Sequence, residues 1–222
     1  MSKHKDASEP KEDMTYQLGL DLLGDQSSLG NVPFDSEACR SCQACGLARE
    51  ARTRVVIGCG NNSADILLIG EAPGEMEDKS GKPFVGLSGK YLRGLMAIAG
   101  LEAEHDCFIT NIVKCRPPKN RNPDAKEAAA CRHWLDSEIH TVGPQVIITA
   151  GAISTGFLLG KSVRITKLRG CWQSYKGIPV MPILHPAYLL RKRIQGKPSV
   201  FDNQTVEDLQ KARELALNPT NR

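Results

Sequence analysis

Three cysteines near the start of the chain follow one another at a strict three-residue interval. Cys39, Cys42 and Cys45 lie in the stretch EACRSCQACGLARE, and the chain of 222 residues holds eight cysteines. In a reducing compartment, thiols this close together are better interpreted as ligands of a metal ion or a metal cluster than as disulfide partners. The spacing therefore predicts a metal or cluster site.

A second set of chemically active residues follows short apolar segments. Glu71 and Phe84 lie in the glycine-rich loop of residues 70–89, Asn111 ends the segment CFITN, and His185 follows IPVMPIL. Each has an ordinary structural explanation, as a helix cap, a core side chain or a turn residue. A carboxylate, an aromatic face, an amide and an imidazole that converge at one sheet edge could instead hold a flat, hydrogen-bonding ring.

These residues need elements that bring them together. Apolar segments alternate with helical patterns, which predicts an α/β fold with a central, mostly parallel four-stranded sheet flanked by helices. In such sheets, ligands bind beyond the carboxyl ends of the strands. The strands are expected over residues 64–70, 107–113, 144–151 and 178–185, and the longer helices over residues 87–100, 123–139 and 205–217.

Composition sets the broad class. Residues 1–35 are polar and are expected to form a mobile N-terminal extension, with a single domain over residues 36–222. The first residues lack the apolar core of a signal peptide and no apolar segment reaches membrane-spanning length, so we expect a cytoplasmic monomer without a membrane partner.

The charge is unevenly distributed. The formal net charge is only +4, yet no acidic residue occurs between Glu138 and Asp202, where lysine and arginine are frequent. Such a one-signed segment suits a polyanion such as nucleic acid, and the alternative is a solvated basic face.

Four motifs carry a resemblance to a known family. GEAPGEMEDKSGKPFVG, TNIVKCRPP, ITKLRG and HPAYLLR, in this order and spacing, resemble the family 4 (iron–sulfur) uracil-DNA glycosylases over about two thirds of the chain, from Cys42 to Arg191. The resemblance implies a three-layer α/β/α domain. It also implies a monofunctional enzyme of base excision repair that flips uracil out of DNA and hydrolyses the N-glycosidic bond, leaving an abasic site.

The resemblance assigns roles in a uracil pocket. Asn111 would read the base edge, Phe84 would stack on the ring, and Glu77 would exclude thymine near C5. His185 and the backbone N–H groups around Ala72 would stabilise the departing uracil anion.

Glu71 would act on the attacking water. Ala72 occupies the position where better-known uracil glycosylases have an aspartate, so Glu71 is either a general base or a positioning group.

The resemblance also assigns the DNA contacts. Two adjacent leucines with an arginine offer an apolar wedge beside a phosphate-binding group. The expected DNA-binding residues are Arg116, Lys119, Arg121, Leu189, Leu190 and Arg191.

By the same resemblance, four cysteines would hold a 4Fe-4S cluster, although zinc would accept the same four thiolates. Cys39 is left as a peripheral spare, and Cys59, Cys107 and Cys171 are expected to be packing residues. The expected ligands are Cys42, Cys45, Cys115 and Cys131.

The segment YQLGLDLLG, with Gln17 to Leu23, resembles the short peptides with which bacterial repair and polymerase proteins bind the sliding clamp. An amphipathic turn that folds back on the domain is the alternative.

Other classes of protein remain open at this point. A redox iron–sulfur carrier would explain the cysteines but not the strand-end residues, and a silent DNA-binding module would explain only the basic loops. A related branch forms a covalent adduct with the abasic sugar through a histidine in a basic insertion. No such insertion is present here, which favours turnover.

Overall fold

The computed structural model describes residues 32–50, 52–194 and 200–217. The sliding-clamp segment at Gln17 to Leu23 and almost all of the predicted extension lie outside these residues. The prediction of one domain over residues 36–222 stays a prediction.

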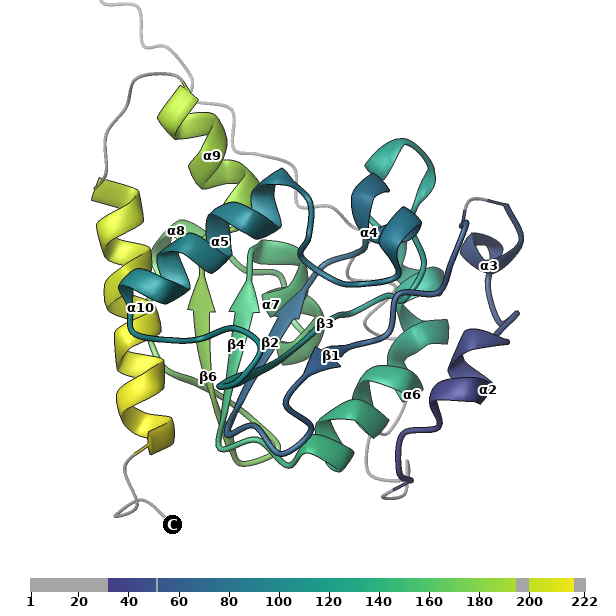
Figure 1. Ribbon diagram of the computed structural model, residues 1–222, viewed down its shortest axis with the longest axis horizontal. Helices are drawn as coiled ribbons and strands as arrows, with labels where there is room; N and C mark the ends of the chain where they lie inside the picture. Colours follow the sequence, from purple (N-terminus) through teal and green to yellow (C-terminus); the bar gives the residue numbers. More distant parts are fainter. Residues whose placement is uncertain (1–31, 51, 195–199, 218–222) are drawn as a thin grey trace, which may run out of the picture.

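The described residues build a six-stranded sheet around which the helices are arranged (Figure 1). The strand order is β1-β3-β2-β4-β6-β5, and the four central strands run parallel, as predicted. The predicted count of four strands is too low, because a short antiparallel strand is added at each edge. The strands are β1 (Cys59–Gly60), β2 (Ile66–Gly70), β3 (Cys107–Asn111), β4 (Val146–Ala150), β5 (Gln173–Tyr175) and β6 (Ile178–Ile183).

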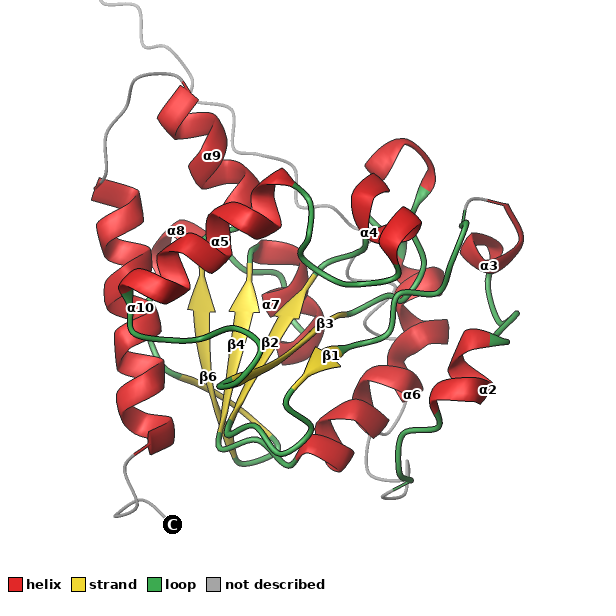
Figure 2. Ribbon diagram, viewed as in Figure 1, coloured by secondary structure: helices red, strands yellow, loops and turns green. Residues whose placement is uncertain are grey.

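Helices cover both faces of the sheet (Figure 2). One face packs against α5 (Leu87–Ile98), α9 (Pro186–Ile194) and α10 (Val200–Leu217). The opposite face packs against α2 (Ser36–Arg40), α3 (Gly46–Glu50), α6 (Ala125–Val142) and α7 (Ala152–Leu159). The three-layer α/β/α arrangement explains why β2, β3 and β4 are buried at every position and read as continuous apolar segments. The shorter elements are α4 (Glu75–Ser80), a 3₁₀ helix (Pro118–Asn120) and α8 (Ile165–Leu168).

Local sequence fixes the ends of α6. Asp124 accepts a hydrogen bond from the Glu127 backbone N–H at 2.8 Å, and the Glu127 carboxylate accepts one from the Asp124 backbone N–H at 2.8 Å. This capping box begins the helix, and Gly143 ends it with a left-handed φ of 60°.

The parallel strands bring their carboxyl ends to one edge of the sheet. Gly70 of β2 is in register with Asn111 of β3, and Ala150 of β4 is in register with Ile183 of β6. The loops that follow these strands therefore meet at this edge. Within the described part of the chain, no helix is both long and apolar enough to cross a membrane.

Candidate active site

A cavity of about 560 Å³ lies beyond the carboxyl ends of the central strands. All six residues predicted for the base pocket line it, and so do two of the predicted DNA contacts, Arg121 and Arg191. Sequence reasoning did not single out Ser88, Pro117, Asn120 or Asn122, which also line the cavity. The predicted pocket residues are Glu71, Ala72, Glu77, Phe84, Asn111 and His185.

The amide and the aromatic ring meet over Gly70. A Cβ atom at Gly70 would stand 2.3 Å from Asn111 Oδ1 and 2.5 Å from Phe84 Cζ. Asn111 is 2% exposed and Phe84 is 9% exposed. The last residue of β2 is therefore best served by glycine, because a side chain there would require Asn111 or Phe84 to shift.

Phe84 has a strained backbone. Its φ is 54°, a left-handed conformation that is uncommon for an aromatic residue. Arg93 Nε donates to the Phe84 carbonyl at 3.1 Å, and Gly89 leaves room for the Phe84 backbone, since a Cβ there would come within 2.3 Å of it. Strain of this kind is found where a side chain must be held in a functional position.

Glu77 lines the cavity, but its carboxylate has a structural partner. Oε1 accepts hydrogen bonds from the backbone N–H groups of Val85 at 2.9 Å and Gly86 at 2.7 Å. The side chain therefore fixes the loop that follows Phe84. This contact was not part of the predicted role, which placed Glu77 near C5 of the base.

The carboxyl group of Glu71 lies at the turn after β2. Burial raises its pKa from the usual 4.5 to about 7. The turn is held to the neighbouring strand end, since the backbone N–H of Ile112 donates to the Gly70 carbonyl at 3.0 Å and that of Val113 to the Glu71 carbonyl at 3.3 Å. The chain thus places near the base pocket a carboxyl group that titrates around neutral pH.

His185 follows β6 and is held as a neutral imidazole. Burial, with a smaller contribution from the charge of Arg191, lowers its pKa to about 4. The backbone N–H of Ala187 donates to Nδ1 at 3.2 Å. Since Nδ1 accepts this bond, the ring proton is assigned to Nε2. A Cβ at Gly151 would stand 2.9 Å from His185 Cβ, so the ring depends on that glycine for space.

The basic rim of the cavity is only partly free to meet DNA. Arg116 Nε donates to Asn120 Oδ1 at 2.7 Å, and Arg121 forms a bidentate pair with Glu127 at 2.8 and 2.6 Å. Lys119 is exposed. The loop thus presents two arginines held by neighbouring side chains and one exposed lysine.

The predicted wedge needs a correction. Leu189 is 1% exposed and packs in the core with α5 and α10, so it cannot enter DNA from this position. Leu190 is half-buried and Arg191 is exposed. Two further exposed apolar side chains adjoin cavity-lining residues, Leu87 beside Ser88 and Met76 beside Glu77.

Five cysteines line one small space: three from the stretch before α3 and two from the loop after β3 and from α6. The backbone N–H of Lys114 donates to the Cys131 thiol at 3.4 Å, and Arg52 Nη1 donates to the Cys115 thiol at 3.6 Å. The four predicted ligands are among the five, which are Cys39, Cys42, Cys45, Cys115 and Cys131.

Two of the sequence expectations about cysteine are wrong. Cys39 is 0% exposed and lines the same space as the four predicted ligands, so it is not peripheral. Cys171 is exposed and is not a packing residue, whereas Cys107 is buried as expected.

Thiolates at these positions are donors that both a 4Fe-4S cluster and a zinc ion accept. Among the described residues, no group of three or more His, Cys, Asp or Glu side chains is close enough to hold one metal ion.

The structure thus combines a cavity at the carboxyl edge of a parallel sheet, lined by an amide, an aromatic ring, an imidazole and carboxyl groups, with a separate cysteine-rich space. A family model described as the uracil DNA glycosylase superfamily matches residues 57–210, and the chain belongs to this superfamily.

The relatives point to one branch. The chain is 44% identical over 184 residues to a Type-4 uracil-DNA glycosylase of Thermotoga maritima, covering 81% of this chain and 92% of that protein. It is 45% identical over 199 residues to a Type-4 uracil-DNA glycosylase of Saccharolobus solfataricus, covering 86% and 91%. A Type-5 uracil-DNA glycosylase of Thermus thermophilus is 34% identical over 120 residues, covering 48% and 54%.

Proposed function

We propose that this protein is a uracil-DNA glycosylase that hydrolyses the N-glycosidic bond of uracil in DNA and leaves an abasic site. The observation that carries the proposal is the pairing of the Asn111 carboxamide with the Phe84 ring over Gly70 at the cavity wall. The Type-4 names of several relatives support it.

The carboxamide can select uracil. Asn111 would accept a hydrogen bond from uracil N3–H and donate one to O4, whereas cytosine presents the opposite pattern. In a buried pocket the mismatch leaves polar groups unpaired, at a cost of about 1 to 3 kcal/mol for each group. The Phe84 ring supplies a stacking face for a base flipped out of the helix.

His185 can stabilise the leaving group. As the glycosidic bond breaks, positive charge develops on the sugar and negative charge on uracil, largely at O2. A neutral imidazole with its proton on Nε2 donates a hydrogen bond to that oxygen without an exchange of protons with solvent. The backbone N–H groups of the turn at residues 71–73 would act on the same anion.

Glu71 acts on the attacking water. Its ionised carboxylate can accept a proton from water as the water approaches the sugar carbon, and burial makes it more basic than an exposed glutamate. Ala72 offers no second carboxylate at this turn, so Glu71 is the group of the motif that can orient the water.

The rim would bind the DNA backbone. Arg116, Lys119, Arg121 and Arg191 can pair with phosphates, while Leu190 can occupy the gap left by the flipped base. Affinity for DNA should then fall as the salt concentration rises, with little dependence on sequence.

We propose that Cys42, Cys45, Cys115 and Cys131 hold a 4Fe-4S cluster. The cluster would cross-link the segment around α2 and α3 to α6 and to the loop that carries the basic rim. Iron and sulfide content together with visible absorption distinguish the cluster from zinc.

One assay tests the activity. The protein is incubated with a uracil-containing oligonucleotide, treated with alkali and run on a denaturing gel. A cleaved band supports the proposal, a shifted adduct indicates the covalent branch, and an unchanged band would contradict glycosylase activity.

Three sequence predictions stay predictions: a cytoplasmic location, a monomeric state and binding of the sliding clamp through Gln17 to Leu23. Deletion of residues 1–30 tests the last, since undiminished clamp pulldown by the shortened protein would refute it.

A further inference from the structure

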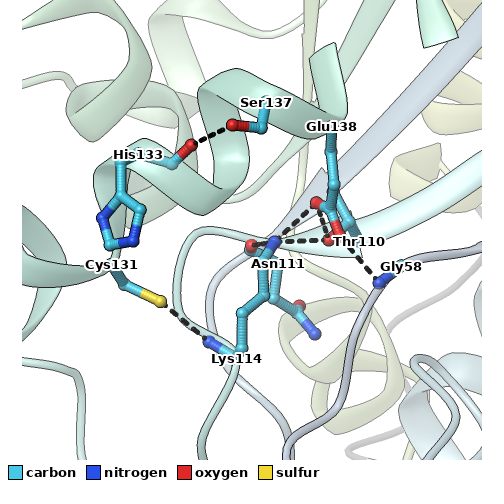
Figure 3. Close-up of polar contacts among 8 residues, drawn as sticks. All are labelled: Gly58, Thr110, Asn111, Lys114, Cys131, His133, Ser137 and Glu138. Atoms are coloured by element: carbon cyan, nitrogen blue, oxygen red, sulfur yellow. Dashed lines mark hydrogen bonds and ion pairs between the residues drawn. The ribbon is translucent and has the colours of Figure 1, made fainter. Parts of the chain in front are cut away.

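A fully buried ion pair between Lys114 and Glu138 adjoins Asn111, and the backbone of its lysine contacts Cys131 (Figure 3). The side chains of Lys114 and Glu138 are 1% and 0% exposed, and Lys114 Nζ stands 2.6 Å from Glu138 Oε2. Nζ also donates to Thr110 Oγ1 at 2.7 Å and to the backbone carbonyl of Asn111 at 2.7 Å. The ammonium group therefore uses all three of its hydrogens.

Glu138 is equally well paired. Its Oε1 accepts from the Gly58 backbone N–H at 2.8 Å, and Oε2 accepts from Thr110 Oγ1 at 2.7 Å as well as from Lys114. A buried ion pair is seldom more stabilising than apolar residues of similar volume. Stability alone is therefore a weak explanation for this complete network.

The position of Lys114 in the chain suggests another explanation. It follows Asn111 by three residues and precedes Cys115, its backbone N–H donates to the Cys131 thiol, and its carbonyl accepts from the Val56 N–H at 2.7 Å. The same α6 carries Cys131 and Glu138, two helical turns apart.

We infer that Lys114, held by Glu138, is a positioning residue that orients the Asn111 carboxamide for uracil. The charged hydrogen bond to the Asn111 backbone carbonyl fixes the peptide group next to the Asn111 Cα, and so fixes the direction in which the carboxamide side chain projects. A small displacement of a group that positions the substrate can lower the rate of the reaction greatly. The inference rests on the proposed function, because it concerns how Asn111 reads the base.

A matched control comes from the other face of the sheet. Asp208 of α10 is 0% exposed and accepts a hydrogen bond from Arg169 Nε at 2.7 Å. Asp208→Asn thus weakens a buried ion pair, as Glu138→Gln does, but it touches neither Asn111 nor the cysteines.

The experiment compares wild type, Glu138→Gln, Lys114→Met, the double variant Lys114→Met/Glu138→Gln and Asp208→Asn. The measurements are kcat/KM for uracil release, the ratio of uracil to cytosine release, inhibition by free uracil, affinity for uracil-free DNA, and Tm. The double variant matters most because it removes both buried charges, which should restore stability without restoring the donor to Asn111.

In Lys114→Met and in the double variant, we expect kcat/KM to fall about tenfold and free uracil to inhibit about tenfold more weakly. This is about the effect of losing one charged hydrogen bond. The uracil-to-cytosine ratio should fall with them, while affinity for uracil-free DNA and the activity of Asp208→Asn remain at wild-type values. A double variant with wild-type inhibition and base ratio would overturn the inference and leave the proposed function intact. Absence of uracil release by wild type would overturn both.

Discussion

The acid limb of the pH profile is the most direct test of the catalytic site. Glu71 must be ionised to accept a proton from water, and burial raises its pKa to about 7. With that pKa, the ionised fraction is about one tenth at about pH 6 and about nine tenths at about pH 8. We therefore expect kcat/KM for uracil release to rise about tenfold over this interval.

His185 should not contribute to the same limb. Burial lowers its pKa to about 4, so the imidazole is neutral over the whole interval and continues to donate from Nε2. An ordinary exposed histidine would titrate nearer pH 6.5. The pH at which the rate rises therefore distinguishes titration of Glu71 from titration of His185.

The measurement is single-turnover release of uracil from an oligonucleotide, with enzyme in excess, at a series of pH values and constant ionic strength. Glu71→Gln keeps the shape of the side chain but cannot be ionised. It should lower the rate by about 10² to 10⁴, the usual contribution of a general base, and it should flatten the acid limb. A limb that persists at the same pH in Glu71→Gln would refute the assignment to Glu71.

The same group gives a test of stability. Because the pKa of Glu71 is higher in the folded protein than in the unfolded chain, the folded state binds more protons between pH 4.5 and about 7, and stability falls as the pH rises through this window. The shift corresponds to a loss of about 3 kcal/mol at most. Glu71→Gln should unfold with a weaker dependence on pH, and an identical dependence in both proteins would contradict the burial of this carboxyl group.

Three further predictions concern the pocket and the cysteines. Asn111→Asp should release cytosine while retaining DNA affinity, because a carboxyl group can accept from the cytosine amino group; no cytosine release with normal uracil release would remove Asn111 from the pocket. Gly70→Ala should lower kcat/KM at least tenfold, since the new methyl group would displace Asn111 and Phe84; wild-type activity would show that the wall can adjust. Cys42→Ser should lose the visible absorption of the cluster and Cys39→Ser should keep it; equal loss in both would make Cys39 a ligand.

The positions of the strand-end residues could be predicted because parallel strands place their carboxyl ends at the same edge of the sheet. Continuous apolar segments identify buried parallel strands, and the residues after them must meet at one edge. The edge strands β1 and β5 could not be predicted in this way, since they have two and three residues and no apolar pattern.

For some residues, burial depends on how the helices pack and could not be predicted from the sequence pattern. Leu189 and Leu190 are adjacent in α9, and only the orientation of the helix decides that Leu189 enters the core. Cys39 follows the spacing of its neighbours, but its burial depends on how α2 packs in the core formed with α6. The burial of Lys114 could not be predicted either, because a lysine after an apolar strand is expected at the surface unless its buried partner, 24 residues away, is known.

Burial has opposite effects on the pKa values of Glu71 and His185, the two groups proposed to act in catalysis, and so gives them different roles. Glu71 is shifted upward and His185 downward, so around neutral pH the cavity is lined by a carboxyl group of raised basicity and by a neutral hydrogen-bond donor. A protonated histidine would attract DNA phosphates as well as the uracil anion. A neutral donor favours the anion only as it forms, which makes its contribution greater in the transition state than in the bound substrate.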